Sequence, residues 1–505
     1  MIDGVETARG ARSRTGDHRT DRADLDPAFA APMVAPAGSR DTGIETPMTW
    51  RVTALLFLFG TALAGLAAAR RVGPRSAAAL VAIGAPAIFL PIAAGNRRRQ
   101  PVGGGRTSRA LTAPILPIRS SSKPSLGSEC FNPAVTVIVA ARDERESLPS
   151  LLADLGHQDL VWPAGGPAFE VIVIDDRSRD GTGSLARAAA DAAGIGDITT
   201  VVRRDGERLA DGKGAALAAW PVEACRGDVI VVLDADARIG PGYLRTLARA
   251  VAMGHRATAG RIRIRRAGGG ILSHLQDDEQ ALDAEIQRGR WMLGGCPELR
   301  GNGIVVSRLA LVAAGGWRPS LTEDLDLSAR LAIRGLRVAW LDDCHVTAEA
   351  VVAGRDLFRQ RVRWAEGSCR RFLEHGPRLL AQGRLPLRAR LDFGAYSMQL
   401  AVPGLLVGAV IGAVRTHRPW AAAGMAATYA AGLGVLSVDA LRPGPNAPRA
   451  RPWLDRVGGG AGVVVLSTIW IVAVPVALLR LAFRRGPVTY AKMAHTGDAA
   501  GGSQQ

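Results

Sequence analysis

The stretch Val229-Ile230-Val231-Val232-Leu233-Asp234-Ala235-Asp236 decides the fold class of this chain. Its five apolar residues are typical of a short buried strand. Two carboxylates, Asp234 and Asp236, follow at the end of that strand. Since ligands of open parallel sheets lie beyond the C-terminal ends of the strands, the pattern predicts a binding site there.

Further strands and helices alternate on both sides of this stretch. Apolar, mostly β-branched runs predict strands near 135–140, 171–174, 199–202 and 337–341. Periodic segments predict helices near 147–155, 186–193, 215–224, 324–333 and 357–374. Strand, helix and strand in succession imply parallel units, so we expect an α/β domain of the Rossmann-like type.

Apolar, uncharged runs flank this domain, at 52–69, 76–95, 393–414, 420–438 and 457–479. Each is long enough to cross a bilayer, which needs about 20 apolar residues. The alternative is a set of buried core helices, although such helices seldom run so far without a charge. We therefore expect an α/β domain inserted between transmembrane helices.

The domain division follows from these changes in composition. We expect a disordered tail at 1–47, transmembrane segments at 48–95, a basic linker at 96–132, the α/β domain at 133–390, further transmembrane segments at 391–485 and a tail at 486–505. The basic triplet 97–99 follows the second run and predicts a cytoplasmic domain in a multi-pass plasma-membrane protein. Arginines at 70–71 and 484–485 do not fit a simple hairpin count, so one run in each group could lie in the membrane interface.

Charge and cysteine content narrow the function classes. The net charge of +17 would suit nucleic acid or anionic lipid, but aromatic residues are only 5% and no aromatic-basic stripe is present. We therefore expect membrane lipids and no nucleic acid as partners. Five cysteines without metal-ligand spacing indicate reduced thiols, and no chemistry is assigned to them.

The acidic strand end suits a nucleotide-sugar site. One of Asp234 and Asp236 can reach a ribose, and the other can bind a divalent cation that bridges two phosphates. Hard oxygen ligands favour Mg²⁺ or Mn²⁺. Lys213, between two glycines, can add a positive charge. The alternatives are a solvated acidic turn and an ordinary surface lysine.

Two further patterns predict the reacting groups. Asp324 begins a helix, where it could simply cap the N-terminus, but a carboxylate there can also act as general base in a displacement that inverts the anomeric carbon. Gln360, Arg363 and Trp364 share one helix face and can hold sugar hydroxyls and a diphosphate. A basic helix lying on the membrane surface is the alternative.

Roughly half of the chain resembles the catalytic domain of membrane-bound family 2 glycosyltransferases, which include cellulose, hyaluronan and poly-N-acetylglucosamine synthases and glycolipid glucosyltransferases. The matching segments are VTVIVAARDE, VIVIDDRSRDGT, DGKG, VVLDADA, LRGNGIVVSRLALVAAGGW, LTEDLDLSARLAIRG and RQRVRW. The resemblance implies the glycosyltransferase fold called GT-A.

The resemblance also implies roles for single residues. Ala141, Glu144 and Asp176 would contact the nucleotide, although the residues alone also fit two polar strand-to-helix turns with capping Asp and Ser side chains. Asp234 and Asp236 would contact the metal or ribose, and Asp324 would be the base with Glu323 beside it in the substrate site. Lys213, Gln360, Arg363 and Trp364 would bind the diphosphate and the sugars.

Two departures bear on the product. Where the polymer synthases often carry Cys-Gly-Ser at the acceptor site, this chain has Arg300-Gly301-Asn302. A gating segment of Val-Thr-x-Lys type is present only approximately, at 488–492.

We therefore expect transfer from a UDP-sugar to a glycan or a lipid acceptor. A polysaccharide, with a possible export partner, and a single-transfer glycolipid remain open. The alternatives from other classes are a catalytically silent scaffold that binds nucleotide-sugars and a nucleic-acid-binding membrane protein.

Overall fold

The computed structural model describes residues 47–71, 134–163, 165–205, 210–265, 270–381, 384–442 and 451–484. Its centre is a seven-stranded sheet in the order β3-β2-β1-β4-β6-β5-β7. The strands are β1 Val135–Ala141, β2 Phe169–Asp176, β3 Thr199–Arg204, β4 Val229–Asp234, β5 Ala257–Arg265, β6 Ile304–Ser307 and β7 Ala339–Glu349.

Parallel pairing dominates the sheet. Strand β1 lies parallel to both β2 and β4, β2 to β3, and β5 to β7, whereas β6 is antiparallel to its neighbours β4 and β5. The parallel pairs bring the ends of β1, β2 and β4 to one edge of the sheet. This arrangement confirms the predicted α/β class.

Helices cover both faces of the sheet because alternate strand residues point to opposite faces. Val137 and Val139 face one core, and Ile138 faces the other. The first core is closed by α5 Leu148–Gly156, α6 Thr182–Ala192 and α8 Tyr243–Ala252. The second is closed by α7 Lys213–Ala218, α10 Arg308–Ala313 and α11 Glu323–Ile333.

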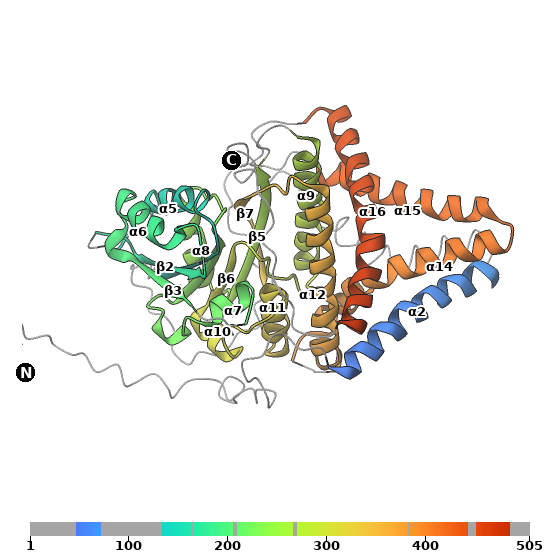
Figure 1. Cartoon of the computed structure of the whole chain (residues 1–505), viewed down its shortest axis with the longest axis horizontal. Coiled ribbons are helices and arrows are strands. Elements are labelled where there is room, and N and C mark those ends of the chain that lie inside the picture. Colours follow the sequence, from blue (N-terminus) through green and yellow to red (C-terminus); the bar gives the residue numbers. More distant parts are fainter. Residues whose placement is uncertain are drawn as a thin grey trace, which may run out of the picture.

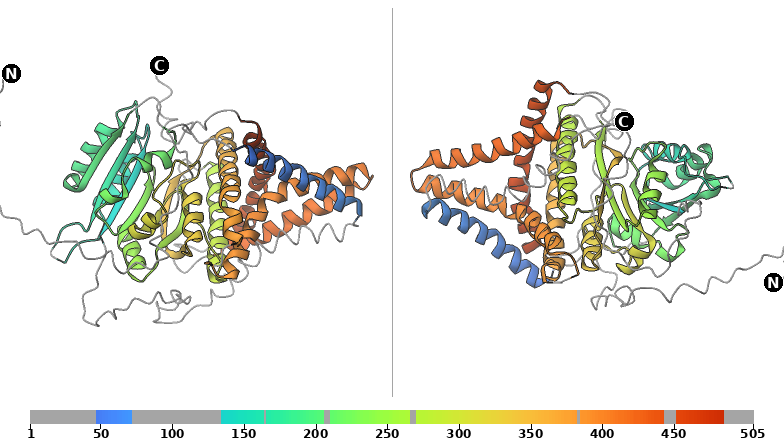
Figure 2. Two further views of the ribbon diagram at one scale, coloured as in Figure 1. Left: turned by 90° about the horizontal axis from the view of Figure 1, so that it is seen from below. Right: turned by 180° about the vertical axis from the view of Figure 1, so that it is seen from behind.

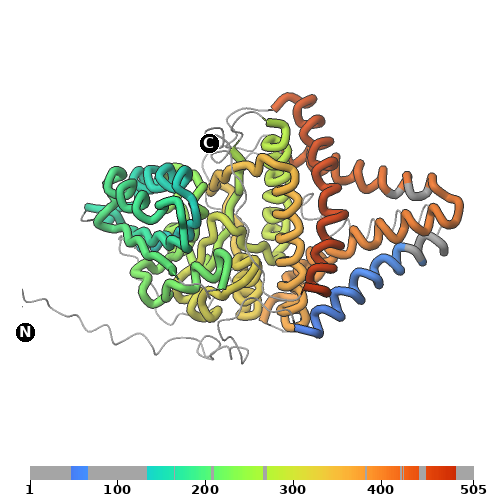
Figure 3. Tube along the Cα trace, viewed as in Figure 1, coloured from blue at the N-terminus to red at the C-terminus, as the bar shows by residue number. Residues whose placement is uncertain are grey.

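Three long helices stand side by side next to this sheet domain: α9 Ile271–Met292, α12 Gly354–Ala381 and α16 Trp453–Phe483 (Figure 1). The tube in Figure 3 shows how closely their paths follow one another. Beyond them, α2 Met48–Arg71, α14 Val402–Arg415 and α15 Pro419–Ala440 project away from the sheet, and both views of Figure 2 show the same projection. Helix α13 Leu387–Ser397 connects the two groups and leads into α14.

Three helical segments of the described chain are long and apolar enough to cross a membrane: Met48–Gly65, Leu387–Arg415 and Trp453–Phe483. They overlap three of the five predicted spans. The predicted span 420–438 corresponds to α15, which is helical but is not among these three. The predicted span 76–95, the linker and both tails lie outside the described residues, and the domain boundaries remain predictions.

Candidate active site

Four of the predicted residues meet at the end of β4. Lys213, at the start of α7, forms an ion pair with Asp234 and lies 3.7 Å from a carboxylate oxygen of Glu323. Its Nζ also donates to the carbonyl oxygen of Gly301 at 2.5 Å. A Cβ placed on Gly301 would lie 3.6 Å from Oδ2 of Asp324. The loop at 300–303 therefore passes between the lysine and the predicted base.

The two oxygens of Asp324 have different surroundings. Oδ1 accepts a hydrogen bond from the N–H of Leu325 at 2.8 Å, so the carboxylate satisfies one free N–H in the first turn of α11, whose N-cap residue is Thr322. Oδ2 is the oxygen near Gly301. A structural role in the first turn of α11 and the catalytic prediction are therefore compatible, because one oxygen fixes the side chain and the other faces the loop.

Burial sets the protonation chemistry of this cluster. Burial raises the pKa of Glu323 to about 7, with the charge of Lys213 opposing the shift and that of Asp324 adding to it. Burial also raises the pKa of Asp324, although the N–H of Leu325 and the charges of Arg300 and Lys213 oppose the change. A carboxylate with a raised pKa is better matched to taking a proton near neutral pH.

Lys213 balances these carboxylates. Burial on its own lowers the pKa of this lysine, but the charges of Asp234 and Glu323 outweigh burial and raise the pKa overall. The lysine therefore stays protonated at neutral pH. It places a fixed positive charge at the end of β4, where the negative charge of a leaving diphosphate could be stabilised.

The two predicted metal ligands are held by different neighbours. Asp234 pairs with Lys213, and its backbone N–H donates to Oδ1 of Asn302 at 3.2 Å. Oδ2 of Asp236 accepts a hydrogen bond from the N–H of Glu349 at 3.0 Å. The side chain of Asp234 is 40% exposed, so its oxygens can be reached. Carboxylate oxygens at an open strand end fit Mg²⁺ or Mn²⁺.

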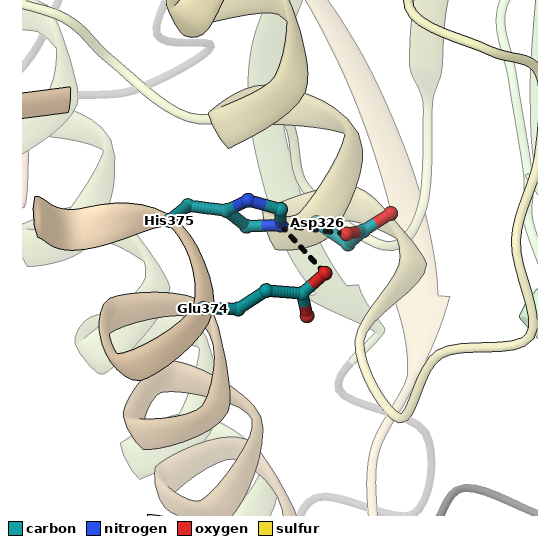
Figure 4. Close-up of side chains that lie close together, drawn as sticks. All are labelled: Asp326, Glu374 and His375. Carbon is teal, nitrogen blue, oxygen red and sulfur yellow. Dashed lines mark hydrogen bonds and ion pairs between the residues drawn. The ribbon is translucent and has the colours of Figure 1, made fainter. Parts of the chain in front are cut away.

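A second acidic cluster lies nearby on α11 and α12. It consists of Asp326, Glu374 and His375, whose possible metal-ligand atoms lie within 4.8 Å of one another (Figure 4). In the described part of the chain, this is the group of acidic and histidine side chains that is close enough together to hold a metal ion. Nε2 of His375 lies 2.9 Å from Asp326, whose other oxygen accepts from Arg330 at 2.8 Å. Burial raises the pKa of Asp326, but Arg330 and His375 outweigh burial and lower it to about 2. Because Arg330 already neutralises Asp326, the cluster is best explained as an ion-paired brace between the two helices.

The predicted nucleotide contacts lie at the ends of β1 and β2. Ala141 is the last residue of β1 and is paired with Asp175, and Glu144 follows in the next turn. Asp176 ends β2 and accepts from Arg204 at 2.7 Å and from Arg177 at 3.0 Å. Because Ala140 of β1 is paired with Asp234 of β4, these turns lie beside the end of β4.

Two residues of these turns have left-handed backbone conformations. Asp143 has φ of 55° and Arg177 has φ of 63°, which is unusual for residues other than glycine. The two turns bind each other, since the N–H of Asp143 donates to Oγ of Ser178 at 3.0 Å. Such conformations gather at ligand-binding turns, where the surrounding contacts maintain them.

Helix α12 carries Gln360, Arg363 and Trp364 and packs closely against the start of α11. A Cβ at Gly367 would lie 2.2 Å from Cγ2 of Thr322, the residue before Glu323. Only glycine permits this approach, so α12 is held directly against the Glu323-Asp324 pair.

Arg361 organises the same part of α12. It is buried, forms an ion pair with Glu279, donates to Oε1 of Gln360 at 2.5 Å and lies 4.3 Å from the ring centre of Trp364. Glu279 in turn accepts from Nε1 of Trp470 on α16 at 3.1 Å. The predicted sugar-binding residues are thus connected to an apolar helix.

Several residues of the site were not predicted from the sequence. Arg361 lies within the segment RQRVRW, but the prediction named only Gln360, Arg363 and Trp364 of that segment. Asn302 and Arg300 lie in the segment that departs from the polymer synthases, and that departure was the available signal. Arg204 forms an ion pair with Asp176 because β2 pairs with β3. The sequence pattern does not reveal this pairing.

The chain is similar to known glycosyltransferases. Residues 136–311 match the family model described as Glycosyl transferase family 2, and residues 229–435 match Glycosyl transferase family group 2. The β-monoglucosyldiacylglycerol synthase of Synechocystis sp. is 30% identical over 380 residues, which is 72% of this chain and 75% of the relative. The synthase of the same name from Trichormus variabilis is 29% identical, over 72% of this chain and 77% of the relative.

Two further similarities are more limited. An undecaprenyl-phosphate 4-deoxy-4-formamido-L-arabinose transferase from Pseudomonas paraeruginosa is 33% identical over 121 residues, 24% of this chain and 33% of the relative. Among solved structures, a mannosyltransferase from Pyrobaculum calidifontis in complex with GDP-Man and Mn²⁺ aligns with a TM-score of 0.42 and 20% identity, over 86% of this chain and 98% of that chain.

Proposed function

The chain belongs to glycosyltransferase family 2, and we propose that it is an inverting enzyme that transfers one sugar from a UDP-sugar to the hydroxyl of a membrane lipid. The observation that carries this proposal is the grouping of Lys213, Asp234 and the Glu323-Asp324 pair around Gly301. The names of the relatives that cover most of the chain support a lipid acceptor in preference to a polysaccharide.

Asp324 is the proposed base. The lipid hydroxyl oxygen attacks the anomeric carbon and forms the new C–O bond, while the bond between that carbon and the diphosphate oxygen breaks. The hydroxyl proton passes to Asp324, and UDP leaves with the electron pair of the broken bond. Since attack comes from the face opposite UDP, an α-linked donor gives a β-linked product.

A divalent cation completes the proposed site. Asp234 and Asp236 would hold Mg²⁺ or Mn²⁺, which would neutralise the diphosphate. Lys213 adds positive charge at the same place. Because the cation would neutralise the diphosphate, its removal with EDTA is expected to stop transfer, and added Mn²⁺ is expected to restore it.

The other predicted residues have donor and acceptor roles in this proposal. Ala141, Glu144 and Asp176 contact uracil and ribose. Gln360, Arg363 and Trp364 hold the diphosphate and the sugars. The catalytic domain lies on the cytoplasmic side of the plasma membrane, and the flanking apolar helices keep it at the lipid surface.

The experiment combines purified protein, Mn²⁺, diacylglycerol micelles and a panel of UDP-sugars, and measures UDP release with and without the lipid. We expect one donor to give lipid-dependent release and a product one sugar heavier than the lipid. A ladder of products would instead identify a polymer synthase. No release with any donor, together with tight UDP binding, would favour the silent scaffold.

A further inference from the structure

Basic residues gather where α12 ends and α13 begins. Residues 376–391, from the last turns of α12 into α13, contain four arginines and no acidic residue. Arg384 and Arg388 are exposed, and Arg390 is half-buried. None of these three forms an ion pair with a residue that the structure describes, whereas Arg238 of the sheet domain pairs with a carboxylate. This corner of the protein therefore carries positive charge that no described carboxylate balances.

Exposed leucines lie among these arginines. Leu387 and Leu391 stand one turn apart on α13 and are 60% and 62% exposed. The opposite face of α13 is buried, because Ala389 and Phe393 pack in one core with the end of α11. Helix α13 thus turns an apolar and basic face outward, which is the composition of a helix at a membrane surface.

The end of α12 belongs to the same surface. Arg390 donates to the carbonyl oxygen of Leu380 at 3.2 Å, and a Cβ placed on Gly394 would lie 3.3 Å from Cδ2 of Leu380. Leu380 is itself 42% exposed. Side chains from both helices therefore form one Arg-Leu surface, which consists of Leu380, Arg384, Leu387, Arg388, Arg390 and Leu391.

Positive charges face one another at the edge of the Arg-Leu surface. A Cβ placed on Gly335, in the turn after α11, would lie 3.3 Å from the backbone oxygen of Arg384. Burial lowers the pKa of the neighbouring Arg334, and the charge of Arg384 lowers this pKa further. A bound anion would relieve the repulsion, and a guanidinium can bind a phosphate through two parallel N–H donors.

The Arg-Leu surface borders a segment that can cross a membrane. Leu387–Arg415 is long and apolar enough to do so, and its first turn carries Arg388. Arginines at the start of such a segment lie at the level of the lipid headgroups. The surface is also remote from the active site, because Ile333, in the same core as Phe393, is nine residues from Asp324 along α11, or about 14 Å.

We propose that the Arg-Leu surface binds anionic phospholipids. The guanidinium groups of Arg384, Arg388 and Arg390 pair with lipid phosphates, and the leucines enter the boundary between headgroups and acyl chains. A zwitterionic headgroup carries its own cation beside the phosphate, so it gains less from these arginines. This site is separate from the donor and the acceptor, and the inference does not rest on the proposed transfer reaction.

The test is the double variant Arg384→Gln/Arg388→Gln, with Arg187→Gln/Arg249→Gln as matched control. Arg187 and Arg249 are exposed arginines of α6 and α8, on the side of the sheet domain away from the projecting helices (Figure 1). Fluorescence anisotropy of labelled phosphatidylglycerol, titrated with the purified full-length protein in neutral detergent, gives Kd. We expect Kd to rise at least tenfold in Arg384→Gln/Arg388→Gln and to stay within twofold in the control.

A conservative variant separates charge from folding. Arg384→Lys/Arg388→Lys keeps both charges, so we expect it to bind phosphatidylglycerol within fivefold of the wild type. Labelled phosphatidylcholine is expected to bind the wild type at least tenfold more weakly than phosphatidylglycerol does, and added salt is expected to weaken the binding of phosphatidylglycerol. The unfolding midpoints of all variants should agree, because the replaced side chains are exposed.

Three results would overturn the inference. The first is an unchanged Kd in Arg384→Gln/Arg388→Gln. The second is an equal loss of binding in the control, which would assign the binding to net charge alone. The third is displacement of the labelled lipid by inorganic phosphate or by a DNA oligonucleotide as readily as by unlabelled phosphatidylglycerol, which would indicate a free-anion or nucleic-acid site. Since the titration uses no sugar donor, failure of the proposed transfer reaction would leave its result unchanged.

Discussion

Asp324 uses its two carboxylate oxygens for different purposes. One accepts the N–H of Leu325 in the first turn of α11, and the other faces the loop that carries Gly301 and Arg300. A carboxylate held in this way loses little conformational freedom when it takes a proton, which is what a positioned general base requires.

Asp324→Asn keeps the shape and the oxygen that accepts from Leu325 but cannot accept the proton. We expect kcat to fall by at least about 100-fold, the contribution typical of general base catalysis. UDP binding, measured by titration calorimetry, should change less than threefold. Asp228→Asn, at the far end of β4 and half-exposed, is the control and should retain activity. Normal turnover by Asp324→Asn would remove the assigned role.

Glu323 makes the folded protein sensitive to pH. Its pKa is about 7 in the folded chain, against 4.5 as the ordinary value. Since a raised pKa means that the unfolded chain ionises more readily, the free energy of unfolding falls as pH rises from about 4.5 to about 7. Relative to Glu323→Gln, the wild type is expected to lose thermal stability over this range. Unfolding midpoints in detergent that run parallel from pH 5 to pH 8 would contradict the shift.

At the scale of elements, helix α12 approaches the start of α11 so closely that a glycine is needed at the contact. Gly367 admits the side chain of Thr322, and thereby sets the position of Gln360, Arg363 and Trp364 relative to Asp324. A displacement of α12 by about 1 Å would misplace these three side chains relative to Asp324 and slow the reaction, although both helices would stay intact.

Gly367→Ala tests this contact. Alanine favours helix formation by about 1 kcal/mol, yet we expect kcat to fall about 10- to 100-fold because α12 must move away from α11. Gly434→Ala on α15 is the matched control, since its Cβ would meet Val464 at an ordinary 3.6 Å. Equal activity of the two variants in the transfer assay would show that the close approach is not needed.

The elements also show how far sequence patterns reach. Strands β1, β2 and β4 were predicted because their apolar runs are buried on both faces, and the edge strand β3 was predicted from its short β-branched run. Strand β5 was missed because arginines alternate with its apolar residues, and Arg261 and Arg263 are paired with Glu285 and Asp277. Helix α9 was missed for the related reason that its buried face carries charged residues whose partners come from distant segments.

The same reasoning applies to the site. Asp234 and Asp324 were named because strand ends and helix starts are visible in a sequence. The positions of Arg300 and Asn302 beside them depend on how the loop after α9 packs, which no local pattern encodes. The family was predicted from motif order and is confirmed by the family models and relatives that match the chain, whereas the roles of single residues remain predictions.

At the scale of the whole molecule, α16 runs across the direction of α2, α14 and α15 and alongside α9 and α12 (Figures 1 and 2). Arg451, just before α16, pairs with Asp278 on α9 at 2.6 Å, and Arg484, just after it, pairs with Glu366 on α12 at 3.1 Å. Both ends of α16 are therefore tied to charged helices of the catalytic domain. We infer that α16 lies along the membrane surface, although its composition would suit a crossing.

This orientation predicts equal membrane depths along α16. Val465, Val472 and Leu479 are exposed on one stripe, and each is replaced in turn by a labelled cysteine. Depth-dependent quenching in vesicles should place the three labels at one depth. A crossing helix would separate the first and last by about 21 Å, since a helix rises about 1.5 Å per residue, and such a gradient would exclude the surface orientation.

The most direct test of the whole account is the proton NMR spectrum of the purified lipid product, made from an α-linked UDP-sugar and diacylglycerol. We predict a single anomeric signal for each glycerol group, with the large coupling of a β-linkage, because Asp324 supports one inverting transfer. An α-anomeric signal, or several anomeric signals for each glycerol group, would contradict that claim.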